Sequence, residues 1–215
     1  MENRVERMKF NVSLLGESHV GKTCMASVFT GHPFDINALT TIGLENYLAT
    51  KKYDGKTYKF KIFDTAGQER YRSIALNTIN LSDGFILVFA VDDRQSFETL
   101  GEWIKSIEEK CDISKKVLIL VGNKIDIENR DVKNEEAVAF AKLRKIDYFE
   151  TSAKTGFGIK ETFEKIFESV YKKYKEIEKL ENEENNEIKK EVPNVTLEKK
   201  NVNQKEKKEK KGGFC

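Results

Sequence analysis

The sequence lacks the features that define several large classes of protein. No run of apolar residues approaches the ~20 that a membrane-spanning helix requires. Lys and Arg number 38 and Asp and Glu 36, and the resulting net charge of +2 gives no argument for a nucleic-acid partner. Cysteines are few: Cys24, Cys111 and Cys215 are odd in number and widely spaced, which argues against a disulfide framework and a zinc site. No internal repeat is visible.

The first residues also lack the marks of export. Met1 to Arg7 are mostly charged and have no apolar core of a signal peptide. Glu2 stands where N-myristoylation would need glycine. We therefore expect a cytosolic protein, and 215 residues predict one ordinary domain with a remainder, or two small domains.

Residues 8 to about 175 alternate between strand-like and helix-like patterns. Strands are predicted at residues 9–15, 44–53, 56–63, 85–91, 117–121 and 147–150. Helices are predicted from Cys24 onward, at 96–110 and 135–144, and from 159 to about 180. Asp54-Gly55 is a hairpin signal, so the second and third strands should be antiparallel. The pattern predicts an α/β doubly wound, mostly parallel six-stranded sheet with helices on both faces and one antiparallel pair.

From about Lys175 the chain becomes rich in Glu, Lys and Asn and poor in apolar residues, which predicts disorder after the last helix. We expect an N-terminal extension (1–7), a folded domain (8–175) and a charged tail (176–215). Residues 199–211 hold seven Lys and two Glu, a charge of about +5, close to Cys215. A basic run beside a lipidated cysteine would form a two-signal membrane anchor, although this sequence is neither Cys-a-a-X nor a double cysteine.

One stretch organises the rest of the chain: Gly16-Glu17-Ser18-His19-Val20-Gly21-Lys22-Thr23. It fits the phosphate-loop pattern and lies between a predicted strand and a predicted helix, as that pattern requires. Its backbone N–H groups and the helix N-terminus would bind phosphates, and its two glycines would allow their close approach. Lys22 would reach the β- and γ-phosphates, and the Thr23 hydroxyl would bind Mg²⁺.

A second motif, Asp64-Thr65-Ala66-Gly67-Gln68, follows the third predicted strand. Asp64 suits a role in holding Mg²⁺ through water. The Gly67 N–H could sense a γ-phosphate, and Gln68 could orient the attacking water.

Two further motifs predict guanine recognition. In Asn123-Lys124-Ile125-Asp126 the Asp126 carboxylate can accept two hydrogen bonds from guanine, whereas adenine offers no such donor pair. In Ser152-Ala153-Lys154 the Ala153 N–H could contact guanine O6, and the stems of Lys124 and Lys154 could cover the base. Each motif alone is also a common turn, but all four follow strand ends in this order, where ligands bind in such sheets.

With these motifs, residues 8 to about 175 resemble the small GTPases of the Ras superfamily, most closely the Rab branch. The Rab resemblance rests on Ile42-Gly43-Leu44-Glu45, on residues 61–71 and on Trp103. It implies that Thr41 closes on Mg²⁺ and the γ-phosphate and that Phe34 packs on the guanine edge. The implied catalytic residues are Gln68, Lys22 and Thr41, and the implied Mg²⁺ ligands are Thr23, Thr41 and Asp64. The implied nucleotide-binding residues are Gly16, Glu17, Ser18, His19, Val20, Gly21, Lys22, Thr23, Cys24, Phe34, Thr41, Gly67, Asn123, Lys124, Asp126, Ser152, Ala153 and Lys154.

The resemblance implies a monomeric switch that binds GTP or GDP with Mg²⁺, hydrolyses GTP slowly and regulates vesicle traffic. Its partners would be an exchange factor, an activating protein and effectors that read the switch regions, with no role for nucleic acid. Cys215 would be lipidated, placing the protein in the cytosol and on the cytoplasmic face of intracellular membranes. Two alternatives stay open: a Ras-type signalling switch, and a nucleotide-locked interaction module with little turnover.

Four features depart from the family pattern. His19 occupies a position where glycine is usual; we expect its side chain to point to solvent, and the alternative is that it alters nucleotide affinity or exchange. Asn46 makes the expected effector face atypical, and Phe63 replaces a usual tryptophan, a modest change in the aromatic cluster. Residues 75–83 lack the expected Tyr-Tyr-Arg-Gly-type sequence. The altered stretch 75–83 puts the identity of regulators and effectors in question, but not nucleotide binding.

Overall fold

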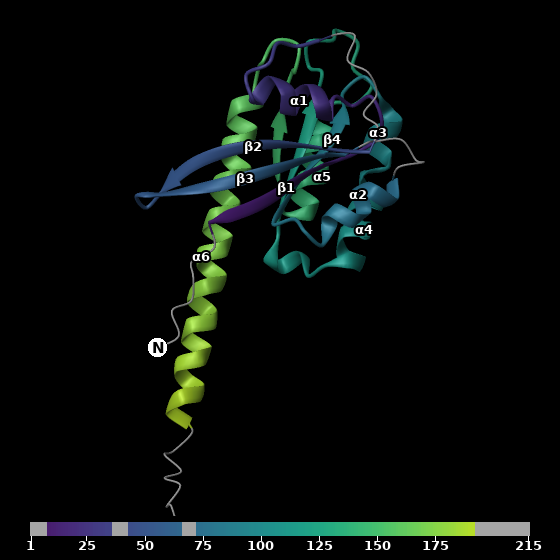
Figure 1. The fold of residues 1–215 in the computed structure, drawn as a ribbon. Helices are drawn as coiled ribbons and strands as arrows, with labels where there is room; N and C mark the ends of the chain where they lie inside the picture. Colours follow the sequence, from purple (N-terminus) through teal and green to yellow (C-terminus); the bar gives the residue numbers. More distant parts are fainter. Residues whose placement is uncertain (1–7, 36–42, 66–71, 192–215) are drawn as a thin grey trace, which may run out of the picture. The chain divides into compact units, whose positions relative to one another are not determined.

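The structure is a computed structural model that describes residues 8–35, 43–65 and 72–191, without the side chains of 72, 74 and 184–191. Strands and helices alternate along the chain, as the sequence pattern predicts (Figure 1). The strands are β1 (Lys9–Leu15), β2 (Leu44–Tyr53), β3 (Lys56–Thr65), β4 (Gly84–Ala90), β5 (Val117–Asn123) and β6 (Asp147–Glu150). The helices are α1 (Lys22–Phe29), α2 (Arg72–Ile79), α3 (Arg94–Glu98), α4 (Leu100–Lys110), the 3₁₀ turn η2 (Ile113–Lys115), α5 (Asn134–Arg144) and α6 (Ile159–Glu191).

The six strands form one sheet in the order β2-β3-β1-β4-β5-β6. β2 pairs with β3 antiparallel, through a turn at Asp54 and Gly55 where both residues have positive φ, 48° and 77°. Each of the other neighbouring pairs is parallel. The predicted fold class, a mostly parallel six-stranded sheet with one antiparallel pair, is therefore confirmed.

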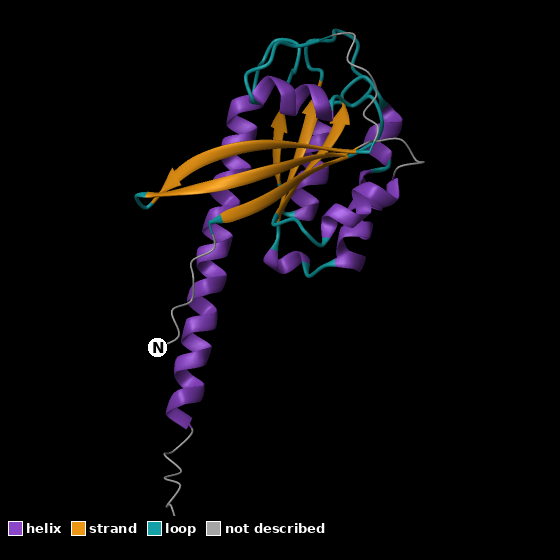
Figure 2. Cartoon of the chain, in the orientation of Figure 1, coloured by secondary structure: helices purple, strands orange, loops and turns teal. Residues whose placement is uncertain are grey.

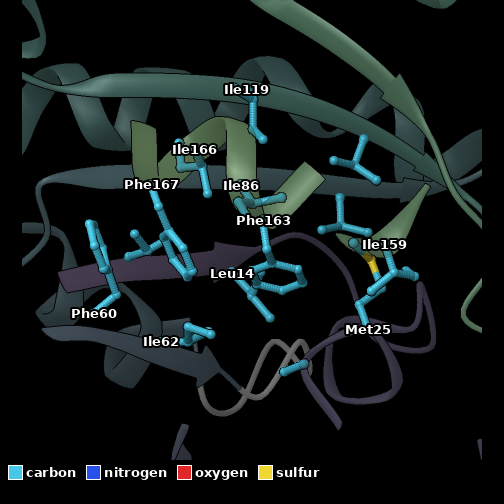
Figure 3. Close-up of a cluster of buried hydrophobic side chains, with 14 of the residues drawn as sticks. Leu14, Met25, Phe60, Ile62, Ile86, Ile119, Ile159, Phe163, Ile166 and Phe167 are labelled. Carbon is cyan, nitrogen blue, oxygen red and sulfur yellow. The ribbon is translucent and has the colours of Figure 1, made fainter. Parts of the chain in front are cut away.

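Helices cover both faces of this sheet. On one face, α1 and α6 pack on the strands through a cluster in which Phe163, Ile166 and Phe167 of α6 face Leu14, Ile86 and Ile119 (Figure 3). On the other face, side chains of α2, α3, α4 and α5 pack around Phe85, Leu87 and Phe89 of β4. β4 is buried at every position, which explains its unbroken apolar sequence.

The parallel strands all direct their carboxyl ends toward one edge, where the connecting loops gather (Figure 2). β1, β3, β5 and β6 end at Leu15, Thr65, Asn123 and Glu150, and each of the four motifs lies at or just after one of these strand ends. In such sheets this edge is the place for a ligand.

Three elements differ from the sequence prediction. We predicted no helix at 72–79, where the structure has α2. The single helix expected at 96–110 is two helices, because the chain turns at Thr99 between α3 and α4. The last helix continues to Glu191, eleven residues past the end expected at about Leu180, because the Glu and Lys residues of this stretch favour helix by themselves.

Contacts divide the chain into two units, Met1–Glu178 and Lys179–Cys215. The first unit contains the sheet, both core clusters and the described motifs. In the second unit the described residues belong to α6, and Lys179 and Glu183 form an ion pair one helical turn apart. Among the described residues, none of the helices has the length and apolarity that crossing a bilayer demands.

Candidate nucleotide-binding site

The loop between β1 and α1 depends on two glycines with left-handed backbone conformations. Gly16 has φ 141° and Gly21 has φ 95°. A Cβ at Gly16 would lie 2.1 Å from the Val88 carbonyl oxygen, and a Cβ at Gly21 would lie 2.3 Å from Asn123 Nδ2. The loop therefore closes onto β4 and β5 at distances that only glycine permits.

Lys22, the first residue of α1, folds its side chain back into this loop. Its ammonium donates to the carbonyl oxygens of Gly16 at 2.9 Å and Glu17 at 2.7 Å. The residue is only 5% exposed, and burial lowers the pKa of its ammonium to about 8, against the opposing charges of Asp64 and Glu17. A buried cation held by neutral carbonyl oxygens is well placed to receive an anion.

The next residue, Thr23, meets the end of β3. Its hydroxyl donates to Asp64 Oδ2 at 2.6 Å, and Asp64 is fully buried. A hydroxyl and a carboxylate oxygen side by side are hard oxygen donors of the kind that Mg²⁺ selects, so these residues fit that ion. The Ser18 hydroxyl oxygen is buried and has no hydrogen-bond partner in the described chain, which fits a loop that receives phosphate oxygens.

Asn123, at the end of β5, joins the two ends of the site. Its Nδ2 donates to the Val20 carbonyl at 2.8 Å. Its Oδ1 accepts from the Thr151 hydroxyl at 3.0 Å and from the Ala153 N–H at 3.2 Å. We expected Asn123 to contact the nucleotide and the Ala153 N–H to contact guanine O6; in this structure the two residues bind each other, and Asn123 is 1% exposed.

Asp126 lies at the base-recognition end of the site. Its Oδ1 accepts from the Ser152 hydroxyl at 2.6 Å, and its Oδ2 lies 3.6 Å from the Lys154 ammonium. The side chain of Asp126 is 15% exposed, so the carboxylate is fixed and still partly open to the surface. Lys124, whose φ is 69°, directs its ammonium to Asp92 at 3.2 Å, and this ion pair fixes its stem beside the motif.

Three described residues of the predicted site differ in their exposure: His19, Cys24 and Phe34. His19 is exposed, as we expected, and has φ 63°. Phe34 and Cys24 are partly buried against the core cluster on the α1 face of the sheet. Burial raises the pKa of the Cys24 thiol.

Three predicted residues lie outside the described residues: Thr41, Gly67 and Gln68. Their assigned roles in closing on the γ-phosphate and orienting water stay predictions. Cys215 also lies outside the described residues.

The structure adds three residues that the sequence analysis did not name for the site. Asp92 pairs with Lys124, and Thr151 supports Asn123. Asp92 follows β4 at the ligand edge of the sheet, so its position after a buried strand was a usable signal. The third is Trp103 of α4, whose indole N–H donates to Glu17 Oε1 at 3.1 Å. No sequence pattern predicts that pairing, because the two residues are 86 positions apart.

Comparison with known proteins finds one family model and relatives of the same family. The Ras family model matches residues 11–172. Rab-13 of Rattus norvegicus is 38% identical over 158 residues, covering 73% of this chain and 77% of the relative. Rab-18-B of Danio rerio is 38% identical over 159 residues, covering 74% and 78%. YPTC6 of Chlamydomonas reinhardtii is 38% identical over 163 residues, covering 75% of each chain.

These relatives favour the traffic switch over the two alternatives, a Ras-type signalling switch and a nucleotide-locked module. The family match and the relatives also agree with the fold and with a site built for GTP, GDP and Mg²⁺. The chain belongs to the Ras family, and it is a Rab-like small GTPase that hydrolyses GTP and regulates vesicle traffic.

Proposed function

We propose that Lys22 is the main cationic contact for the β- and γ-phosphates of the bound guanine nucleotide. One observation carries this proposal: the Lys22 ammonium is buried within the loop, and its acceptors are the uncharged carbonyls of Gly16 and Glu17. A phosphate would supply the charge that these carbonyls do not. The loop's backbone N–H groups and the N-terminus of α1 would add to the attraction.

Thr23 and Asp64 would hold Mg²⁺, with Thr41 as the third protein group by resemblance. The adjacent hydroxyl and carboxylate oxygens of the first two residues support this assignment. The ion, when bound, neutralises charge on the phosphate oxygens. Gln68 would orient the water that attacks the γ-phosphate, and the loop and Lys22 would hold the phosphates in line.

The guanine end would be read by Asp126, with Ser152 and Lys154 keeping its carboxylate in place. The test is to replace Asp126 by alanine and measure GDP and ADP affinity by calorimetry after the nucleotide is stripped. We expect GDP affinity to fall at least 100-fold, because two hydrogen bonds to a charged group are lost, while ADP affinity stays weak. Asp131→Ala, at a nearby exposed position, is the matched control and should leave both affinities unchanged. Equal GDP affinity in the two variants would contradict the role of Asp126.

The switch itself would use the segments around Thr41 and Gly67. We propose that the γ-phosphate holds them in one arrangement and that hydrolysis releases them. Effectors, an exchange factor and an activating protein would read residues 42–47 and 70–76. On β2 the side chains of Leu44, Glu45 and Asn46 are exposed, so this surface offers a partner one apolar, one acidic and one amide side chain.

The charged tail would direct the protein to membranes. The lysine-rich run 199–211 would be drawn to the acidic cytoplasmic leaflet, and a lipid on Cys215 would make the attachment stable. The protein would then divide its time between the cytosol and the cytoplasmic face of intracellular membranes. Intact-mass measurement of the protein from its own cells tests the lipid, and an unmodified Cys215 would exclude it.

A further inference from the structure

Trp103 is the only tryptophan of the chain, and it is 1% exposed within the core cluster on the α4 face of the sheet. A buried indole N–H needs an acceptor. Its acceptor here is the carboxylate of Glu17, at 3.1 Å, which belongs to the phosphate loop. The loop is thus bonded through a side chain to a helix that contributes nothing else to the nucleotide site described above.

Glu17 is also the residue that fixes Lys22. Its carbonyl oxygen accepts from the Lys22 ammonium at 2.7 Å, the shorter of the two bonds that hold this cation. Glu17 follows Gly16, where the loop packs closely against the Val88 carbonyl of β4. The bond from Trp103 restrains Glu17 from the side of α4, and Glu17 is the residue whose carbonyl accepts from Lys22.

We propose that Trp103 is a positioning residue for the nucleotide: its hydrogen bond to Glu17 fixes the phosphate loop and sets how slowly the nucleotide leaves. The inference rests on the nucleotide binding proposed above. A loop that is already in its binding shape loses less conformational entropy when phosphates enter, and it opens less often to release them. Because this hydrogen bond joins α4 to the phosphate loop, a change in the packing of α4 would also change how the loop holds the phosphates.

The first test measures the rate at which GDP leaves the full-length protein. Displacement of a bound fluorescent GDP analogue reports this rate. Trp103→Phe keeps an aromatic ring in the core and removes the N–H. We expect GDP release to become about tenfold faster, because a hydrogen bond to a charged acceptor is lost. Ile107→Val, at a fully buried position of the same helix, is the control for a loosened core and should leave the release rate unchanged.

Variants of Glu17 make the test independent of how well the tryptophan variant folds. Glu17→Gln keeps an acceptor oxygen but loses the charge, so it should release GDP faster than the parent and more slowly than Glu17→Ala, which should match Trp103→Phe. In the double variant of Glu17→Ala and Trp103→Phe the two effects should not add, because one bond is being removed twice. Thermal unfolding of each variant separates these effects from general destabilisation.

The possible outcomes separate the positioning role of Trp103 from nucleotide binding itself. If Trp103→Phe and Ile107→Val release GDP equally fast, or if the effects of Trp103→Phe and Glu17→Ala add fully, the positioning role is wrong while nucleotide binding stands. If the parent itself holds no guanine nucleotide, the proposed function fails and the inference fails with it. In the parent, Trp103 emission should also shift when EDTA strips the nucleotide, and in Glu17→Ala this shift should be absent.

Discussion

His19 shows the cost of one side chain at a position suited to glycine. Its φ of 63° lies in the left-handed region, where an L-residue loses roughly 1–2 kcal/mol, and its side chain is exposed and gains no packing in return. Part of this cost is recovered in the unfolded state, where histidine has less freedom to lose than glycine.

We therefore predict that His19→Gly raises the free energy of unfolding by about 0.5 kcal/mol, the remainder after the unfolded-state difference. Urea unfolding at saturating GDP measures it. Lys145→Gly is a matched control, since Lys145 is also exposed and has φ 56° at the end of α5, far along the chain from the loop. A loss of stability in both variants would show that left-handed strain is not the controlling effect.

Gln68 carries the clearest prediction for the chemical step. Replacement by leucine removes the group proposed to orient the attacking water, and misplaced water costs up to about 100-fold in rate. We expect Gln68→Leu to slow single-turnover GTP hydrolysis at least tenfold with GTP affinity retained. Gln95→Leu, on the exposed surface of α3, is the control. Hydrolysis by Gln68→Leu at the parent rate would remove Gln68 from the mechanism.

At the scale of elements, Glu150 joins β6 to the chain around it. Its Oε1 accepts from Arg130 Nη2 at 2.6 Å, from Asn134 Nδ2 at 2.8 Å and from the Tyr148 hydroxyl at 3.0 Å. Burial raises the pKa of the Glu150 carboxyl, but these hydrogen bonds outweigh it, and the net pKa lies below its usual value.

A lowered pKa stabilises the fold above the carboxyl's unfolded-state value of about 4.5, and this stabilisation is lost as the pH falls through the folded-state value. We predict that Glu150→Gln lowers the free energy of unfolding at pH 7 by about 1 kcal/mol, and that the gap narrows as the pH falls below about 4.5 and the carboxylate becomes protonated. Urea unfolding from pH 3 to 7 tests it. Glu98→Gln, which removes an exposed partner of Arg94, should change stability by less than about 0.5 kcal/mol. A gap that stays constant with pH would contradict the prediction.

The elements that the sequence predicted share strong apolar patterns, and the ones it missed do not. β1, β2 and β6 have the predicted bounds, because alternation and turn signals define them. α2 was missed because part of its buried face is polar: Thr78 of α2 hydrogen-bonds Ser13 at 2.8 Å, and Ser13 lies 2.7 Å from the Ser82 hydroxyl. Apolar periodicity cannot detect packing made by hydroxyl groups.

The candidate site was also predicted only in part. Which loops meet could be predicted, because parallel strands bring their carboxyl ends to one edge. What each side chain binds could not, because that depends on distances within the folded chain. The hydrogen bonds of Asn123 to the Val20 carbonyl and the Ala153 N–H could not be read from the sequence, and its expected contact with the nucleotide stays a prediction. The ion pair of the Lys124 ammonium with Asp92 was likewise not predicted, and the expected position of the Lys124 stem over the base stays a prediction.

At the scale of the whole molecule, the folded domain and the lysine-rich run differ in charge pattern. We predict that unlipidated protein binds phosphatidylserine vesicles weakly and loses binding as salt is raised, since each lysine near such a surface contributes about 1 kcal/mol. Changing Lys207, Lys208, Lys210 and Lys211 to glutamine should abolish sedimentation with these vesicles.

The control for this prediction changes the same number of lysines in the folded domain. Lys52, Lys59, Lys105 and Lys142 are exposed there, and their replacement by glutamine alters net charge equally. Vesicle binding should persist in that variant. Equal loss in both variants would mean that total charge, and not the run at 199–211, draws the protein to the lipid.

The close approach of Gly21 to Asn123 has a consequence for how this sequence can evolve. Any side chain at 21 would displace the Asn123 amide, whose Nδ2 lies 2.3 Å from the position that a Cβ would take. Shortening residue 123 to make room would leave the Val20 carbonyl and the Ala153 N–H without their shared partner. The two motifs, about a hundred positions apart, therefore constrain each other: a substitution at 21 is tolerated only with a compensating change at 123, and the reverse also holds.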